Sequence, residues 1–306
     1  MMAWTSLAEH ISVAQTFYGD TAQRRVADWI AREEDLVGNT AFAKHFASHF
    51  ETYDAREADY AHRKIHSSQG ALLGGIRFFG GDTHRPFVDV IAHDFGESAM
   101  AYAALAACVA EEWRVFSPRS MRVLVSAARF EKMRSQTPAT RLDQSVFAAR
   151  CDQMAPPDQR VTLAPFGTAS EAVAMVEARY RDLAQTQPAL AQDVAPSDPE
   201  DIQDMWQANQ LHAITVQGTT VGALAVAPSG CAWIDGAEIM EEVVSCGYAG
   251  HGYAASAQKA WAAHHGTAES LLFGTIDGAN LASQRTAERA GRAMVLAYAF
   301  IDLPPV

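Results

Sequence analysis

The stretch from Val243 to Ala255 decides the fold, and it reads Val-Val-Ser-Cys-Gly-Tyr-Ala-Gly-His-Gly-Tyr-Ala-Ala. An apolar, β-branched run leads into a turn with three glycines, and the turn opens an alanine-rich segment that continues to Trp261. This pattern predicts a strand, a turn and a helix. Glycines let the backbone approach a ligand closely, and the first N–H groups of a helix have no partner within it. With the helix dipole, these groups form a site for phosphate oxygens.

A second segment, from Gly278 to Gly291, strengthens this interpretation. The two segments together resemble the GNAT superfamily of acyl-CoA-dependent N-acyltransferases, and most of all its branch that acetylates ribosomal-protein amino termini. In that branch a turn reading x-Pro-x-Tyr-x-Gly-x-Gly-Tyr-Ala follows a strand, and the motif Asn-x-x-Ser-x-Arg and then Glu-x-x-Gly comes later. The matching residues are the turn Ser245 to Ala254 and then Asn280, Ser283, Arg285, Glu288 and Gly291. The alternative is a strand–turn–helix unit of any other α/β protein.

A chain of 306 residues exceeds one typical domain, so two domains are expected. The resemblance implies an α/β (α+β) GNAT acetyltransferase domain over residues 161–306, with a mixed, mostly antiparallel central sheet flanked by helices. Residues 136–160 are expected to be a connection, and residues 1–135 an accessory α/β domain. Within it, residues 60–130 follow the order of the second half of a GNAT domain but carry acids where phosphates would lie. They are expected to form a degenerate GNAT-like half that holds no CoA, or else an unrelated α/β fold.

Hydrophobic periodicity places the secondary structure of both halves. In the long alanine-rich helix, Met100, Leu105, Cys108 and Trp113 are expected in the core. Residues 146–149 fit either a short helix or a strand. Helices are expected at 21–31, 40–50, 97–116, 170–183, 199–209, 250–264 and 281–290, and strands at 71–79, 87–92, 121–126, 161–163, 212–217, 220–227, 237–245, 271–276 and 293–300.

Charge and composition narrow the function. The formal net charge is −12, with 24 Lys and Arg against 36 Asp and Glu, which disfavours nucleic-acid binding and favours a cationic or amine substrate. The four cysteines are scattered and no metal-ligand spacing is present, so neither a metal site nor a disulfide framework is expected. No signal peptide or membrane span is apparent. We therefore expect a cytoplasmic protein whose partner is a small-molecule or peptide amine; its oligomeric state is left open.

The resemblance also assigns cofactor contacts. It implies two strands that part, with the acyl-pantetheine chain of acetyl-CoA lying between them. The pyrophosphate falls to the backbone amides from Ala249 to Ala254, and Asn280 contacts the pantetheine amide. The tyrosines of the turn are equally expected as ordinary rim residues, and Arg285 as a surface residue. The full set of expected cofactor contacts is Val243, Val244, Ser245, Tyr248, Ala249, Gly250, His251, Gly252, Tyr253, Ala254, Asn280, Ser283 and Arg285.

Direct acetyl transfer needs a base for the amine, and the resemblance favours Glu238 on the strand before the turn. The chain holds one extra residue between Ile239 and the turn compared with that branch, which a β-bulge would absorb. Because side-chain direction alternates along a strand, this shift makes Glu241 and Glu242 rival bases. Each of the three carboxylates is also expected as an ordinary solvated or ion-paired group, because a base at this position needs a pKa raised toward neutrality.

The acid that protonates the leaving thiolate is less well defined. Most family members carry a tyrosine seven residues after the asparagine, but that position here is Ala287. The resemblance offers Ser283 instead, which is equally suited to capping the following helix. The missing tyrosine keeps a second interpretation open, in which the protein is a catalytically weak or inactive CoA-binding sensor or scaffold.

Overall fold

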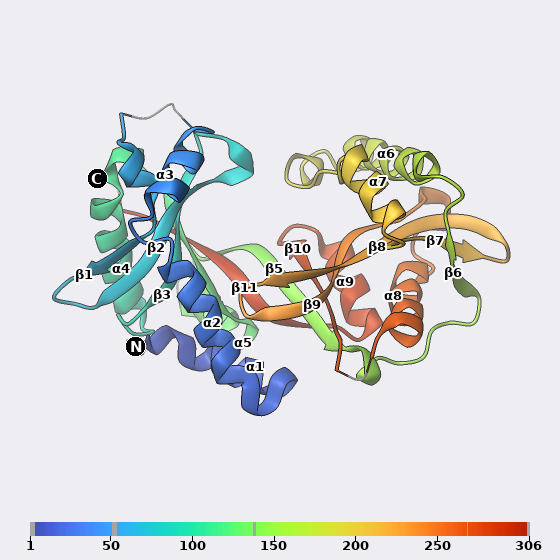
Figure 1. Cartoon of the computed structure of the whole chain (residues 1–306), viewed down its shortest axis with the longest axis horizontal. Coiled ribbons are helices and arrows are strands. Elements are labelled where there is room, and N and C mark those ends of the chain that lie inside the picture. Colours follow the sequence, from blue (N-terminus) through green and yellow to red (C-terminus); the bar gives the residue numbers. More distant parts are fainter. Residues whose placement is uncertain (1–3, 51–53, 137–138, 268, 305–306) are drawn as a thin grey trace. The chain divides into compact units, whose positions relative to one another are not determined.

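Alternating strands and helices form two mixed α/β units, as the fold class predicted (Figure 1). The computed structural model describes residues 4–50, 54–136, 139–267 and 269–304. Unit 1 comprises Met1–Asp143 and Leu296–Val306, and unit 2 comprises Gln144–Val295. These bounds differ from the expected ones. The expected connection contains a strand that enters unit 2, and the last strand, expected in the second domain, returns to unit 1, because strand pairing joins segments far apart in sequence.

Unit 1 has the strand order β1-β2-β3-β4-β11. The neighbours pair antiparallel except β3 and β4, which are parallel and are connected through a helix. The N-cap of that helix is Ser98, whose side chain accepts a hydrogen bond from the backbone N–H of Ala101. The strands are β1 (Arg63–His66), β2 (Ala71–Phe78), β3 (Pro86–His93), β4 (Ser120–Ser126) and β11 (Ala293–Asp302), and the α-helices are α1 (Ala8–Tyr18), α2 (Ala22–Glu34), α3 (Thr40–Ala47), α4 (Ala99–Glu112) and α5 (Ala127–Gln136).

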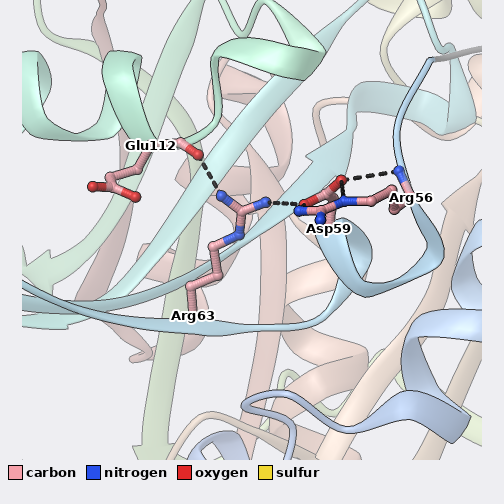
Figure 2. A network of polar contacts seen from close by, with 4 residues as sticks. All are labelled: Arg56, Asp59, Arg63 and Glu112. Atoms are coloured by element: carbon pink, nitrogen blue, oxygen red, sulfur yellow. Dashed lines mark hydrogen bonds and ion pairs between the residues drawn. The ribbon is translucent and has the colours of Figure 1, made fainter.

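A polar network fixes the carboxyl end of α4 in unit 1. Figure 2 shows the guanidinium of Arg63 between the backbone carbonyl of Glu112 and the carboxylate of Asp59. Asp59 also accepts a hydrogen bond of 2.9 Å from the backbone N–H of Arg56. A cation at a helix carboxyl end compensates the helix dipole. The network therefore has a structural role.

Unit 2 has the strand order β5-β10-β9-β8-β7-β6. Only β9 and β10 are parallel, so the sheet is mixed and mostly antiparallel, as predicted. The strands are β5 (Arg141–Arg150), β6 (Val161–Pro165), β7 (Leu211–Val216), β8 (Thr219–Cys231), β9 (Ile234–Val244) and β10 (Leu271–Asp277), and the α-helices are α6 (Ala169–Thr186), α7 (Pro199–Gln207), α8 (Tyr253–His265) and α9 (Leu281–Ala290).

Helices cover both faces of the unit 2 sheet (Figure 1). On one face, Ala257 and Trp261 of α8 pack against Leu224 and Leu272 of the strands. On the other face, helices α6 and α7 pack over Ala223, Ala225 and Val243, with Val176 and Ile202 among the buried residues. Adjacent residues of β9 therefore face different helix layers.

Most expected elements are present, and the differences include strand β1, which lies in a segment without an expected strand. Met100 is 81% exposed although it was expected in the core, whereas Leu105 of the same helix and Trp113, which directly follows it, are fully buried, because only one side of α4 contacts the strands. Helix α5 was not anticipated, since its polar sequence shows a weak apolar period. The open choice at residues 146–149 is decided in favour of strand β5.

Candidate active site

Strands β9 and β10 part in the middle of unit 2. Their parallel ladder joins Ala237 with Leu272 and Glu238 with Phe273, and it goes no further. Beyond Glu238, β9 continues to Val244 paired only with β8, and β10 continues along β5. The parting that the sequence led us to expect is therefore present.

A β-bulge on β9 lies directly beyond the last paired residue. On β8, Val226 pairs with Ile239 and Ala225 pairs with Glu241, so Met240 is the extra residue. This is the bulge that the extra residue in the sequence predicted. It bends β9 away from its neighbour and sets the direction of the side chains that follow.

A cavity of about 250 Å³ fills the gap between the parted strands. We call it the unit 2 wedge. It contains three of the four expected catalytic residues, Glu241, Glu242 and Ser283, together with Asn280; Glu238 lies in the paired part of β9, outside its lining. The lining residues are Gln144, Tyr180, Asp193, Val194, Ala195, Ile239, Met240, Glu241, Glu242, Gly274, Thr275, Ile276, Asp277, Asn280, Ser283 and Arg292.

Glu242 points toward α8, where it meets a buried glutamine. The side-chain nitrogen of Gln258 donates to both carboxylate oxygens of Glu242, at 2.8 and 3.0 Å. The amide oxygen of Gln258 accepts a hydrogen bond of 3.0 Å from Nε of Arg292. Burial raises the pKa of Glu242, and the nearby positive charge of Arg292 opposes that rise.

Glu241 points the other way, toward α6. One oxygen accepts from the backbone N–H of Ser197 at 2.9 Å, and the other from the hydroxyl of Tyr180 at 3.4 Å and the backbone N–H of Glu242 at 3.1 Å. Burial raises the pKa of Glu241, and these hydrogen bonds oppose the rise. Burial, together with the Glu241 charge, also raises the pKa of Tyr180.

The glycine turn joins the end of β9 to α8. Gly250 and Gly252 have φ angles of +81° and +76°, a region that favours glycine. Within the described part of the chain, the amides of Gly250, His251 and Gly252 donate no backbone hydrogen bond, and the next three amides open α8. The expected phosphate amides are thus available, except that of Ala249, which donates to the carbonyl of Cys246 at 3.1 Å.

Two arginines that the sequence did not single out lie beside this turn. The guanidinium of Arg160 forms an ion pair with Asp158 and lies 5.7 Å from the ring centre of Tyr253. The Tyr253 ring also stacks on His251, with ring centres 5.5 Å apart. Nη1 of Arg179 lies 3.9 Å from Sγ of Cys246. Both come from segments that precede the turn by more than sixty residues, so only the fold brings their charges to it. Tyr248 is exposed at the rim, and Arg285 is exposed on α9 outside the wedge lining.

The start of α9 forms the second wall of the wedge. The side-chain oxygen of Asn280 accepts a hydrogen bond of 3.1 Å from the backbone N–H of Ser283, so the asparagine is the cap of this helix. The helix cap therefore uses the backbone N–H of Ser283, and Ser283 is also one of the residues that line the wedge. Ala287, where a tyrosine was expected, is fully buried against Phe147 and Ile276.

Unit 1 contains a similar parting that is filled by the chain itself. The parallel ladder of β3 and β4 ends at Val90 and Val123. Beyond it, the hydroxyl of Ser6 accepts from the backbone N–H of His93 at 2.9 Å, and Nε2 of His10 lies 3.0 Å from the carbonyl of Leu124. The remaining cavity measures only about 20 Å³.

Only solved structures show a similarity to this chain. No family model and no curated protein matches the chain. Among solved structures, it is similar to an acetyltransferase from the GNAT family from Colwellia psychrerythraea, with 12% identity, a TM-score of 0.45, and coverage of 85% of this chain and 95% of that one. It is also similar to a GCN5-related N-acetyltransferase from Sphaerobacter thermophilus (14% identity, TM-score 0.46, 90% and 95% covered).

A tandem GNAT protein from the clavulanic acid biosynthesis pathway is similar too, with 13% identity, a TM-score of 0.41, and coverage of 88% of this chain and 97% of that one. At identities of 12–14% and TM-scores below 0.5, these similarities assign no chemistry to the residues of the wedge. The resemblance to the ribosomal-protein branch stays a prediction. Among the described residues, no helix is long and apolar enough to cross a membrane, and no group of three or more His, Cys, Asp or Glu is placed to hold a metal ion.

Proposed function

We propose that unit 2 is an N-acetyltransferase that binds acetyl-CoA and transfers its acetyl group to an amine. One observation carries the proposal: the cavity between parted β9 and β10 holds carboxylates and a serine, and β9 leads from it directly into a glycine turn with open amides. The pyrophosphate would accept hydrogen bonds from the amides of Gly250 to Ala254, assisted by the nearby Arg160 and Arg179. The pantetheine chain would run along β9 past Ser245, Val244 and Val243 into the wedge.

The reaction requires two proton movements. As the amine nitrogen bonds to the thioester carbon, one proton passes from the nitrogen to a carboxylate, directly or through water. As the C–S bond breaks, the departing thiolate takes a proton that the hydroxyl of Ser283 relays from solvent. The protonated carboxylate returns its proton to solvent, so one proton is taken up and one is released in each cycle. A carboxylate of β9 that lines the wedge, Glu241 or Glu242, would accept the proton in the first step. Burial raises the pKa of both, as a general base working near neutral pH needs.

The acyl donor is proposed to bind in unit 2 alone. In unit 1, side chains of the first helical segment occupy the parting, and Glu97 and Glu9 both pair with Arg129 beside it. At this place in unit 1 a negatively charged cofactor would face these two acids. At the corresponding place in unit 2 it would face the open backbone amides of the glycine turn. Unit 1 is proposed as the accessory half, and the protein as a cytoplasmic enzyme with a small-molecule or peptide amine as acceptor.

Calorimetric titration with acetyl-CoA tests the binding step. We expect a dissociation constant in the micromolar range, which corresponds to a binding free energy of about −8 kcal/mol. The chemical step is tested by detecting released CoA thiol with a panel of mono-, di- and polyamines and short peptides. Absence of both heat and thermal stabilisation would refute the site.

The buried Ala287 favours one rival, a CoA-binding sensor or scaffold without turnover, because this alanine stands where most members of the resembled family carry the tyrosine that protonates the thiolate. The two functions differ in a single measurement. If acetyl-CoA binds and no amine in the panel releases thiol faster than buffer, the scaffold is the correct interpretation.

A further inference from the structure

Arg292 is an unusual residue for its position in unit 2. Only 3% of it is exposed, and among the described residues no carboxylate lies within ion-pair distance of it. Its guanidinium contacts the amide oxygen of Gln258 at 3.0 Å and the carbonyl of Phe147 at 3.4 Å. Burying a cation without a direct counter-ion costs free energy, so the presence of a buried arginine at this position needs an explanation.

The backbone of β10 makes room for this cation. A Cβ atom at Gly274 would lie 3.1 Å from Nη1 of Arg292 and 3.6 Å from Cβ of Ile239. The guanidinium therefore lies in the gap where β9 and β10 part, at the wall of the wedge. Burial lowers the pKa of Arg292 to about 10, and the charge of Glu242 opposes this, so the residue is a cation at neutral pH.

Gln258 separates this cation from the carboxylate of Glu242 and contacts both. Its nitrogen donates to Glu242 and its oxygen accepts from Arg292, so the orientation of the amide is determined by its partners. A direct contact between guanidinium and carboxylate would use the carboxylate oxygens and depress its pKa strongly. The glutamine spacer leaves lone pairs on Glu242 open to the wedge while the positive charge still acts on it.

We propose that Gln258 and Arg292 are positioning residues that make Glu242 the base of the wedge. This inference rests on the proposed function of unit 2. Gln258 holds the carboxylate toward the cavity, and Arg292 keeps enough of it ionised at neutral pH to accept a proton from the amine or from an intervening water.

The neighbouring carboxylate is used differently. The oxygens of Glu241 accept hydrogen bonds from three separate donors, the Ser197 and Glu242 amides and the Tyr180 hydroxyl, and these bonds tie the segment before α7 to β9. Both oxygens of Glu242 accept from one group only, the side-chain nitrogen of Gln258. Glu241 also faces the α6 layer, whereas Glu242 faces the α8 layer, on which α9 packs with Ser283 in its first turn. The other ionisable groups lining the wedge are Tyr180, Asp193, Glu241 and Asp277, all anionic or neutral.

The test follows the ionisation of Glu242 directly. Carbon-13 labelling of glutamate carboxyls gives a titration curve for each residue by NMR, and the Glu242→Gln spectrum identifies the Glu242 signal. Arg292→Met should raise the pKa of Glu242 by about one unit, because an opposing charge is lost. Arg292→Lys, which keeps the charge, should leave it within about 0.3 unit. Arg289→Met, an exposed arginine three residues earlier on α9, is the matched control.

Where the acceptor screen gives turnover, the same variants are compared by rate. The acidic limb of kcat/KM against pH should move upward with Arg292→Met, lowering the rate about tenfold below the new pKa, and Arg292→Lys should restore it. Gln258→Met should lower kcat at every pH with an unchanged KM for acetyl-CoA, because only the orientation of the base is lost. Circular dichroism and thermal unfolding select variants that fold.

An unchanged pKa of Glu242 in folded Arg292→Met overturns the inference. So does a pH profile of kcat/KM whose acidic limb is lost in Glu241→Gln and kept in Glu242→Gln. Failure of the proposed function is a separate result: the unsubstituted protein would then bind no acetyl-CoA, whatever the carboxyl titrations show.

Discussion

A negative charge introduced into the turn between β9 and α8 should weaken acetyl-CoA binding, and Coulomb's law gives the magnitude. Gly250 has φ of +81°, and a Cβ atom there would meet no atom within 4 Å. Any side chain at this position therefore costs backbone strain, about 1–2 kcal/mol, without a steric clash. Gly250→Gln and Gly250→Glu carry the same strain and nearly the same shape, so their difference isolates the charge.

The magnitude follows from Coulomb's law. Two unit charges about 6 Å apart interact by about 0.7 kcal/mol in water and about 2.8 kcal/mol at an effective dielectric constant of about 20. A carboxylate at Gly250 facing the two charges of a pyrophosphate should thus weaken acetyl-CoA binding by about 1.4 to about 5.6 kcal/mol, which is about tenfold to about ten-thousandfold, relative to Gly250→Gln. Because exposed charges are screened, about 0.5 M salt should reduce that ratio.

Calorimetry at low and high salt measures both constants, and thermal unfolding checks that the two variants are equally stable. Equal affinities of Gly250→Gln and Gly250→Glu at low salt would show that no phosphate lies at this turn. The proposed placement of the cofactor would then be wrong even if acetyl-CoA binds elsewhere.

Three further predictions address the wedge and unit 1. Gly274→Ala should lower the free energy of unfolding by about 1–3 kcal/mol, measured by urea titration, because its methyl group displaces Arg292; an unchanged midpoint would contradict the close approach. Burial lowers the pKa of His10 to about 4 from 6.5, so the unfolded state binds more protons between these pH values, and the free energy of unfolding should fall by about 3 kcal/mol as pH drops from 6.5 to 4. His10→Gln should show a smaller fall, and equal falls would be evidence against this cause. Asn280→Ala should lose about 1 kcal/mol of stability with the helix cap, whereas Asn280→Asp keeps the acceptor for the Ser283 amide and should lose acetyl-CoA affinity alone; equal unfolding midpoints for the two would contradict the capping role.

Several features of unit 2 could be predicted from local sequence. The strand before the turn, the helix after it and the hairpin at Gly218 follow from periodicity and turn residues, which act over a few positions. The bulge at Met240 was also predicted, because the resemblance implies one residue fewer between Ile239 and the turn than this chain holds. The candidates Glu241, Glu242, Asn280 and Ser283 came from the same local motifs.

Pairing between distant segments could not be predicted in this way. The apolar pattern of β11 is the same whichever strand it joins, so the sequence did not reveal that most of it belongs to unit 1. Met100 shows the same limit, because an apolar residue on an alanine-rich helix is buried only if a partner covers that side.

The sequence by itself determined that a glycine turn with open amides follows a carboxylate-bearing strand, because turns and strand periods depend on neighbouring residues alone. Only the tertiary structure decided which carboxylate has which surroundings. Gln258 and Arg292 were not singled out by either motif. Gln258 contacts Glu242, and Arg292 contacts Gln258, only because α8 and the segment that follows α9 come together in the fold. Electrostatic effects act through space, and the pKa of a carboxyl is therefore a property of the fold.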